Sequence, residues 1–202
     1  STPKPSSAAS DVYKRQVADY VLKHTPGNTV SNLSSSRALK DVTEAYGQQY
    51  HAAAVGEVNV VAEMKRTHSV IGGEGNGGVI YPESHYGRDA LVGVGLFLSH
   101  YVAQSKKMTE LKSTYPPYFI SKNKMTLSPD MDVDKILEGL KERYATEKVT
   151  DIDGVKIDFA QGWVHLRKSN TEPIIRIYSE AKDEAAANQL AEEVIAAAKS
   201  TF

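Results

Sequence analysis

Apolar residues recur along the chain in two alternating patterns, one with the period of a helix and one typical of short strands. Between Ala38 and Ala45 they fall at helical spacing, and Gly47 follows as a residue that can end a helix. Short β-like runs flank this segment, and the longest apolar helix is expected within residues 87–105. This alternation of strands and helices through about residue 110 predicts an α/β layer structure.

The pattern changes after the Tyr-Pro-Pro-Tyr sequence at residues 115–118. A helical segment at 131–145 precedes three strand-like runs, and an alanine-rich segment at 182–200 has acidic residues early and lysine late, as a helix dipole favours. This order predicts a smaller α+β domain in which helices cover an antiparallel sheet. We therefore expect domains at 17–115 and 116–202.

Residues 1–16 differ from the rest, because they are rich in Ser, Pro and Ala and show no apolar period. They also lack the apolar run of a signal peptide. We expect them to be a non-native or disordered tail, joined to a domain that the chain enters partway through.

Composition limits the classes of partner. The 24 basic and 25 acidic residues give a net charge of -1, so no broad field attracts nucleic acid and any anion site must be local. No apolar run reaches the ~20 residues that a membrane span needs. The absence of cysteine excludes disulfides and thiolate metal sites and fits a reducing cytoplasm.

The stretch GGEGNGG, residues 72–78, combines five glycines with Glu74 and Asn76. It satisfies G-x-G-x-x-G, but the dinucleotide fingerprint must open a helix, and here Val79–Tyr81 and a proline favour a strand. No Lys-Ser/Thr follows, so a P-loop is excluded too. We interpret the stretch as a glycine loop between two strands that presents Glu74 and Asn76 at its tip. The alternative is a flexible hairpin with no functional role, because glycine often does no more than supply a positive φ in a turn.

A second polar loop occupies residues 167–176 and supplies guanidinium, hydroxyl and amide groups: Arg167, Ser169, Asn170, Thr171 and Arg176. These groups, with several backbone N–H groups, are what an anion cradle needs. The alternative is a polar hairpin whose arginines form surface salt bridges.

Two other features are weaker candidates for chemistry. The acids that alternate within residues 130–135 resemble a metal loop, but the stretch lacks the glycine of an EF-hand and continues into a helical period, which favours an acidic helix start. No two histidines have the i, i+4 spacing of a helical zinc site. His85, seven residues after the glycine loop, is the candidate for a proton-transfer group.

Together these segments resemble the α-D-phosphohexomutases, the family of phosphoglucomutases, phosphomannomutases and phosphoglucosamine mutases. RKSNTEPIIRIYSE, residues 167–180, is similar to the phosphate-binding loop of the family's fourth domain, and GGEGNGG is similar to the sugar-binding loop of its third. The resemblance covers residues 17–202 and implies the C-terminal half of a phosphosugar mutase.

In this family a phosphoserine passes its phosphoryl group to a sugar monophosphate, and a bisphosphate intermediate links hexose 1- and 6-phosphates. The resemblance implies a phosphorylated hexose or hexosamine as ligand, with sugar contacts from Glu74, Gly75 and Asn76 and phosphate contacts from the second loop. The motif sequences most resemble those of phosphoglucosamine mutases. The alternatives are a phosphomannomutase, a phosphoglucomutase and a stand-alone phosphosugar-binding module.

The chain departs from the family pattern in two respects. Where many members read G-E-x-S-G-H, Asn76 replaces the hydroxyl residue and Gly78 replaces the histidine, and His85 is one candidate to fill that gap. Neither the phosphoserine sequence T-A-S-H-N-P nor the magnesium sequence D-G-D-x-D-R occurs. The resemblance therefore implies Mg²⁺ bound outside this chain, none bound by it, the N-terminal half of the mutase as a partner, and no turnover by this chain alone.

Overall fold

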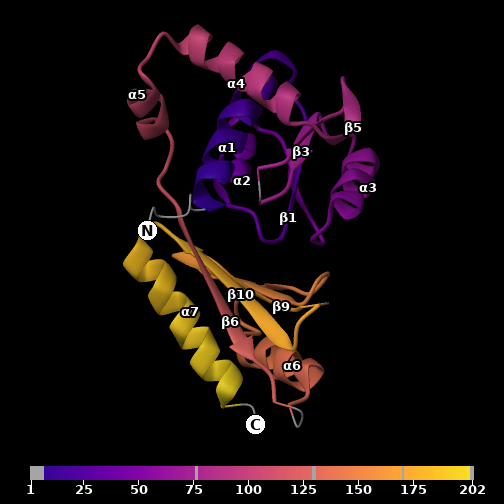
Figure 1. Cartoon of the computed structure of the whole chain (residues 1–202), viewed down its shortest axis with the longest axis vertical. Helices are drawn as coiled ribbons and strands as arrows, with labels where there is room; N and C mark the ends of the chain where they lie inside the picture. The colour runs from indigo at the N-terminus through magenta and orange to yellow at the C-terminus, as the bar shows by residue number, and fades with distance from the viewer. Residues whose placement is uncertain (1–6, 76, 129–130, 170, 201–202) are drawn as a thin grey trace. The chain divides into compact units, whose positions relative to one another are not determined.

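The computed structural model describes residues 7–75, 77–128, 131–169 and 171–200, and the chain divides into two compact units, Ser1–Pro116 and Pro117–Phe202 (Figure 1). Each unit contains one five-stranded sheet. The fold class expected from the sequence, an α/β domain followed by a smaller α+β domain with an antiparallel sheet, is confirmed.

The first unit is built on a mixed sheet in the order β2-β1-β3-β4-β5. Its parallel strands are β1 Thr29–Asn32, β2 Tyr50–Ala53 and β3 Ile71–Gly73. Its antiparallel strands are β4 Val79–Tyr81 and β5 His85–Arg88. Parallel neighbours require a helical crossover, whereas antiparallel neighbours are joined by a short loop. The glycine loop is therefore the hairpin connection from β3 to β4.

Helices cover both faces of this sheet, and Figure 1 shows α1 and α3 on opposite sides of it. One face packs against α1 Ser7–His24, α2 Ala38–Ala45 and α4 Ala90–Gln104. The other packs against α3 Glu57–Thr67, and α5 Met108–Ser113 follows α4. As the sequence predicts, α2 stops just before Gly47, which has a φ of 69°.

The expectation of disorder does not hold for residues 7–16, because α1 already begins at Ser7. Lys14, Arg15 and Gln16 are all buried. Long polar side chains can bury their aliphatic stems when their polar ends find partners. Arg15 Nη1 donates to the carbonyl of Pro116 at 2.7 Å, so this part of the helix belongs to the fold of the first unit.

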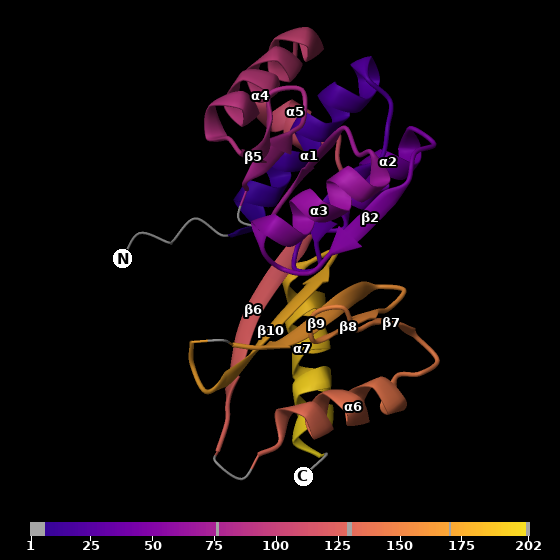
Figure 2. The ribbon, with the colours of Figure 1, turned by 90° about the vertical axis from the view of Figure 1, so that its right-hand side faces the viewer.

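The second unit is an antiparallel sheet in the order β6-β10-β9-β8-β7. The strands are β6 Phe119–Thr126, β7 Lys148–Thr150, β8 Val155–Asp158, β9 Gly162–Lys168 and β10 Ile174–Ala181. One face packs against α6 Val133–Arg143 and α7 Glu184–Lys199, and Figure 2 shows α7 running behind the strands. Apolar side chains from alternate strand positions fill the layer between them.

The outer edge of this second sheet differs from the sequence expectation in one respect. The first of the three strand-like runs covers residues 151–159, but β7 ends at Thr150 and β8 begins only at Val155. Gly154, with a φ of 68°, turns the chain just before β8. A Cβ there would lie 2.1 Å from the carbonyl oxygen of Leu166, so only glycine fits.

Candidate functional site

In the first unit, three loops meet at the carboxyl ends of the parallel strands. After β1 the chain goes to β2 at the sheet edge and then returns to β3 on the other side of β1, so the strand order reverses between β1 and β3. Such a switch point is where open α/β sheets bind ligands. Glu74 links the three segments there through hydrogen bonds. Its Oε1 lies 3.3 Å from Asn32 Nδ2 and 3.2 Å from the backbone nitrogen of Gly56.

Glu74 is buried, with 6 % of its surface exposed. Its Oε2 lies 3.1 Å from Arg88 Nη1. Glu74 lies in the hairpin turn, and its carboxylate points inward to fixed donors. A carboxylate has about four acceptor sites, so Asn32, Gly56 and Arg88 leave capacity for a donor from a ligand. Asn76 lies outside the described residues.

The glycines of this loop allow segments of backbone to approach each other closely. A Cβ on Gly73 would lie 2.1 Å from the carbonyl oxygen of Gly78, and one on Gly75 would lie 2.8 Å from that of Ser34. Within the described part of the loop, only Gly77 has a positive φ, of 90°. These glycines therefore allow close backbone approach as well as the positive φ at Gly77.

A buried lysine of α1 forms hydrogen bonds to the glycine loop and to Ser35. Lys14 is 2 % exposed, and its Nζ donates to Ser35 Oγ at 3.2 Å and to the carbonyl of Glu74 at 2.9 Å. Sequence reasoning missed Lys14 because it excluded this part of the chain. The signal was present, since Tyr13, Val17 and Val21 follow each other at helical spacing.

A cavity of about 430 Å³ opens beside the loop and is lined by Glu57, Gly77, Gly78, Arg88 and Ala90. Glu57 accepts from Arg88 twice, from Nε at 2.7 Å and from the backbone nitrogen at 3.1 Å. These hydrogen bonds lower the pKa of Glu57, and the bond to Glu57 raises the pKa of Arg88, so both are charged at neutral pH. With Glu74, the cluster places two carboxylates around one guanidinium. Sequence reasoning missed this pair because its members are 31 positions apart.

His85 lies on β5, with a half-exposed side chain whose Nε2 is 3.0 Å from Asp89 Oδ2. Asp89 is the N-cap of α4 and accepts from the backbone nitrogens of Leu91 and Val92. The bond from Val92 and then that from His85 hold the pKa of Asp89 below its usual range. The structure thus ties His85 to a helix cap, and a proton-transfer role for it stays a hypothesis.

In the second unit, Arg167 on β9 and Arg176 on β10 face each other in the antiparallel register. Their neighbours Leu166, Ile175 and Ile177 lie in the core under the helices. Side chains alternate along a strand, so both arginines point to the opposite face of the sheet. The fold therefore brings together two guanidinium groups that the sequence places nine positions apart.

Each of these arginines has a carboxylate near it. Arg167 Nε lies 3.4 Å from Asp153 Oδ2, and Arg176 Nη2 lies 3.0 Å from Glu172 Oε2. The salt bridges of the alternative interpretation therefore exist, but they do not cover the arginines: Arg167 and Arg176 keep 22 % and 37 % of their side chains exposed.

The loop between the two arginines is narrow and rich in donors. The backbone nitrogen of Ser169 donates to the carbonyl of Ile174 at 3.0 Å, which continues the ladder of β9 and β10. Ser169 Oγ lies 3.5 Å from both Oγ1 and the backbone nitrogen of Thr171. Asn170 lies outside the described residues. Two hydroxyl groups thus sit together at the end of the strand that carries Arg167.

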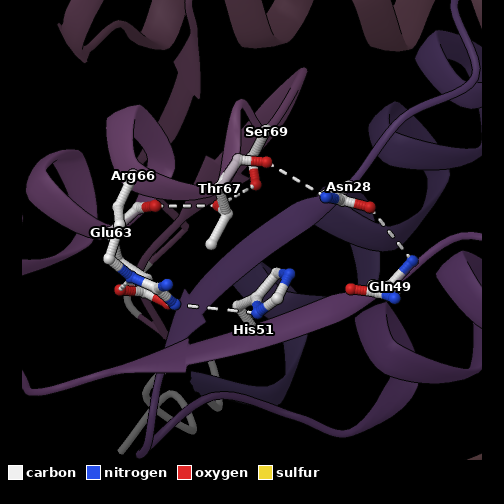
Figure 3. Close-up of polar contacts among 7 residues, drawn as sticks. All are labelled: Asn28, Gln49, His51, Glu63, Arg66, Thr67 and Ser69. Carbon is white, nitrogen blue, oxygen red and sulfur yellow. Dashed lines mark hydrogen bonds and ion pairs between the residues drawn. The ribbon is translucent and has the colours of Figure 1, made fainter.

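A different polar cluster occupies the amino ends of the parallel strands (Figure 3). Asn28 Nδ2 donates to the carbonyl of Thr67 at 3.0 Å, and Asn28 Oδ1 accepts from the backbone nitrogen of Gln49 at 3.2 Å. Thr67 Oγ1 donates to the carbonyl of Glu63 at 2.8 Å and lies 2.7 Å from Ser69 Oγ. These bonds satisfy backbone groups of α3 and of Gln49, just before β2, so we assign the cluster a structural role.

The described part of the acidic stretch, residues 131–135, leads into α6, as the sequence interpretation predicts. Asp132 is the N-cap, and its Oδ1 accepts from the backbone nitrogens of Asp134 and Lys135. Asp130 lies outside the described residues. Within the described ranges, no group of three or more His, Cys, Asp or Glu residues is placed to hold a metal ion.

Two family models match the chain. One, phosphoglucomutase/phosphomannomutase alpha/beta/alpha domain III, matches residues 11–118, and the other, the phosphoglucomutase/phosphomannomutase C-terminal domain, matches residues 122–197. The chain belongs to the phosphohexomutase family. Its two units correspond to the third and the C-terminal domains of the family.

Curated relatives agree with this assignment. A phosphoglucosamine/phosphogalactosamine mutase of Sulfurisphaera tokodaii is 36 % identical over 167 residues, which are 82 % of this chain and 37 % of that protein. A phosphoglucomutase/phosphomannomutase of Thermococcus kodakarensis is 37 % identical over 179 residues, which are 87 % of this chain and 39 % of that protein. The chain thus spans less than half the length of these relatives.

Solved structures share the fold. A phosphoglucomutase/phosphomannomutase family protein from Burkholderia thailandensis has a TM-score of 0.77 at 22 % identity and covers 95 % of this chain and 41 % of its own. The N-acetylphosphoglucosamine mutase of Aspergillus fumigatus, in complex with GlcNAc-6P and magnesium, has a TM-score of 0.59 at 14 % identity, with 96 % and 43 % covered. At these identities the likeness concerns the fold alone.

Asp132 and Asp134, the acids nearest to a metal-loop pattern, belong to a helix start. Across the described ranges, the helices are too short or too polar to cross a membrane.

Proposed function

We propose that this phosphohexomutase chain supplies the sugar and phosphate recognition sites of an intramolecular phosphotransferase that interconverts hexose 1- and 6-phosphates through a bisphosphate. The phosphoserine and magnesium loops would come from the N-terminal half of the mutase, in the cytoplasm, and this chain alone would not turn over substrate. The observation that carries the proposal is the facing pair Arg167 and Arg176 beside the Ser169 loop.

The facing arginines suit a phosphate for an electrostatic reason. Two like charges directly opposite each other on neighbouring strands repel, and a dianion between them removes that cost. Arginine also matches phosphate geometry with paired N–H donors. Ser169, Thr171 and Asn170 add hydroxyl and amide donors. Binding of the non-reacting phosphate supplies binding energy at a distance from the reacting phosphate. A mutase needs such a site because it binds its intermediate in two orientations.

The glycine loop is proposed as the sugar site. Glu74 keeps acceptor capacity for a hydroxyl of the sugar while Asn32, Gly56 and Arg88 hold it in place. Gly75 and Asn76 would complete the contact from the same loop. A carboxylate oriented by fixed donors loses little entropy when a ligand binds.

We favour a hexosamine phosphate over a hexose phosphate as the substrate. Two carboxylates, those of Glu57 and Glu74, lie at Arg88, and a carboxylate accepts a hydrogen bond from an ammonium group as well as from a hydroxyl. Several relatives bear the name phosphoglucosamine mutase, which supports this choice. Phosphomannomutase or phosphoglucomutase activity is the alternative, as the name of the Thermococcus relative indicates.

Calorimetric titration of the chain with glucosamine 6-phosphate and with glucose 6-phosphate tests the proposal. We expect both to bind and the amino sugar to bind more tightly. A mutase assay would then compare the chain alone with the chain mixed with an N-terminal half that carries T-A-S-H-N-P and D-G-D-x-D-R. Activity only in the mixture supports the proposal, binding without activity in either favours a stand-alone binding module, and turnover by the chain alone contradicts it.

A further inference from the structure

Position 78 has an unusual environment for the last residue of a ligand-binding loop. Its φ is not in the positive range, so its backbone would accept a side chain. A Cβ on Gly78 would nevertheless lie 2.5 Å from Cδ and 2.9 Å from Cγ of Arg88. The stem of Arg88 therefore occupies the space into which a side chain at position 78 would project.

This arrangement bears on the departure of the chain from the family pattern. Many members place histidine where this chain has Gly78, so they have a polar side chain beside the sugar loop that this chain lacks. His85 does not fill that space, because the three atoms nearest to the missing Cβ all belong to Arg88. His85 instead pairs with Asp89 at 3.0 Å.

Arg88 also has donors to offer. Its Nε is directed to Glu57 at 2.7 Å and its Nη1 to Glu74 at 3.1 Å. The side chain of Arg88 is 42 % exposed. Arg88 is one of the residues that line the 430 Å³ cavity, together with Gly77 and Gly78. The two carboxylates restrict its orientation, so it would donate in a defined direction.

From this geometry we infer that Arg88 is a substrate-contacting residue that takes the place of a side chain at position 78 and donates from its terminal guanidinium nitrogens to an oxygen of the phosphosugar. The inference rests on the proposed function, because the ligand is the phosphosugar of the same site. Arg88 would give the sugar site a cationic hydrogen-bond donor, whereas the carboxylate of Glu74 is only an acceptor. Gly78 and Arg88 then depend on each other, because only a residue without a side chain at position 78 leaves space for the stem of Arg88.

A double-mutant cycle on the whole chain tests the pair, with glucosamine 6-phosphate as the titrated ligand and calorimetry as the readout. Arg88→Ala removes the guanidinium, and Gly78→Ala displaces the stem of Arg88 while leaving its charge. We expect each single variant to bind at least about tenfold more weakly, as is typical when a charged hydrogen-bond donor is lost. The double variant should bind with the same affinity as Arg88→Ala, because the methyl group that Gly78→Ala adds then contacts no arginine stem.

Two controls separate contact with the ligand from indirect effects. Arg66→Ala removes a guanidinium from another glutamate pair of the same unit, with Glu63 at 2.6 Å, and it should bind like the wild type. Glu57→Gln breaks the pair that holds Arg88 but keeps the guanidinium, so it should lose less affinity than Arg88→Ala. An equal or greater loss in Glu57→Gln would show that Arg88 acts through Glu57, and it would overturn the inference.

The remaining outcomes are also decisive. Wild-type affinity in Arg88→Ala, or losses that multiply in the double variant, would overturn the inference while the proposed function stood. If the wild-type chain bound neither glucosamine 6-phosphate nor glucose 6-phosphate, the proposed function would fail and this inference with it. Inorganic phosphate, titrated into each variant, should bind equally in all of them, because the phosphate loop of the second unit is unchanged.

Discussion

Arg167→Met removes one of the two facing guanidinium groups and keeps an unbranched apolar stem. In the ligand-free chain two effects oppose each other. The ion pair with Asp153 at 3.4 Å is lost, and a partly exposed pair contributes about 0–1 kcal/mol. The repulsion from Arg176 across the strands is relieved, which is worth about 0.2–1 kcal/mol. We therefore expect the free energy of unfolding of the second unit to change by less than about 1 kcal/mol.

The effect on binding should be much larger. A hydrogen bond to a charged group contributes about 1.5–3 kcal/mol, so the affinity for glucosamine 6-phosphate should fall by about 10- to 150-fold. At a ligand concentration of 100 Kd, binding stabilises the wild type by about 2.7 kcal/mol. A variant that binds 30-fold more weakly gains only about 0.9 kcal/mol at the same concentration.

Tryptophan fluorescence measures both quantities in one experiment. The chain has 1 tryptophan, Trp163, which is fully buried in the second unit, so its fluorescence in urea follows the unfolding of that unit. Arg143→Met on α6 is the matched control, because Arg143 is exposed and lies on a helix far from the loop in sequence. Full ligand stabilisation in Arg167→Met, with the same gain as in Arg143→Met, would refute the phosphate role of Arg167.

Three further predictions concern stability. Burial lowers the pKa of His165 from 6.5 to about 4, so the unfolded chain takes up a proton between these values and the folded chain does not. The second unit should therefore be most stable above pH 6.5 and lose on the order of 3 kcal/mol as the pH falls towards 4, and urea titrations of His165→Gln should lack this component. Gly162→Ala should destabilise the same unit by about 1–3 kcal/mol, because the new Cβ would lie 1.9 Å from the carbonyl oxygen of Glu180; an unchanged urea midpoint would contradict this. Gly95→Ala should stabilise the first unit by about 0.5–1 kcal/mol, since Gly95 is inside α4 with nothing within 4 Å; thermal circular dichroism measures the change, and a lower melting temperature would count against it.

Periodicity and turn chemistry, which are local, were sufficient to predict the fold class of both units. The helix that ends before Gly47, the strand after the glycine loop and the acidic start of α6 were all predicted from neighbouring residues. The two loops proposed to recognise sugar and phosphate were also predicted, because each is a dense run of unusual residues. Local composition misled at residues 13–16 of α1, where it outweighed a helical period, and the strand pattern misled at residues 151–154, which precede β8.

The tertiary structure decided which side chains meet. Glu74 turns inward because the reversal of strand order between β1 and β3 places donors from other loops around it. Lys14 reaches the carbonyl of Glu74 across 60 positions, and Arg88 meets Glu57 across 31. Contacts at such separations depend on the order and direction of the strands, and a local pattern of polar and apolar residues does not contain that information. The sequence by itself therefore determined the elements and the candidate loops, and the packing of those elements determined the partners of each polar group.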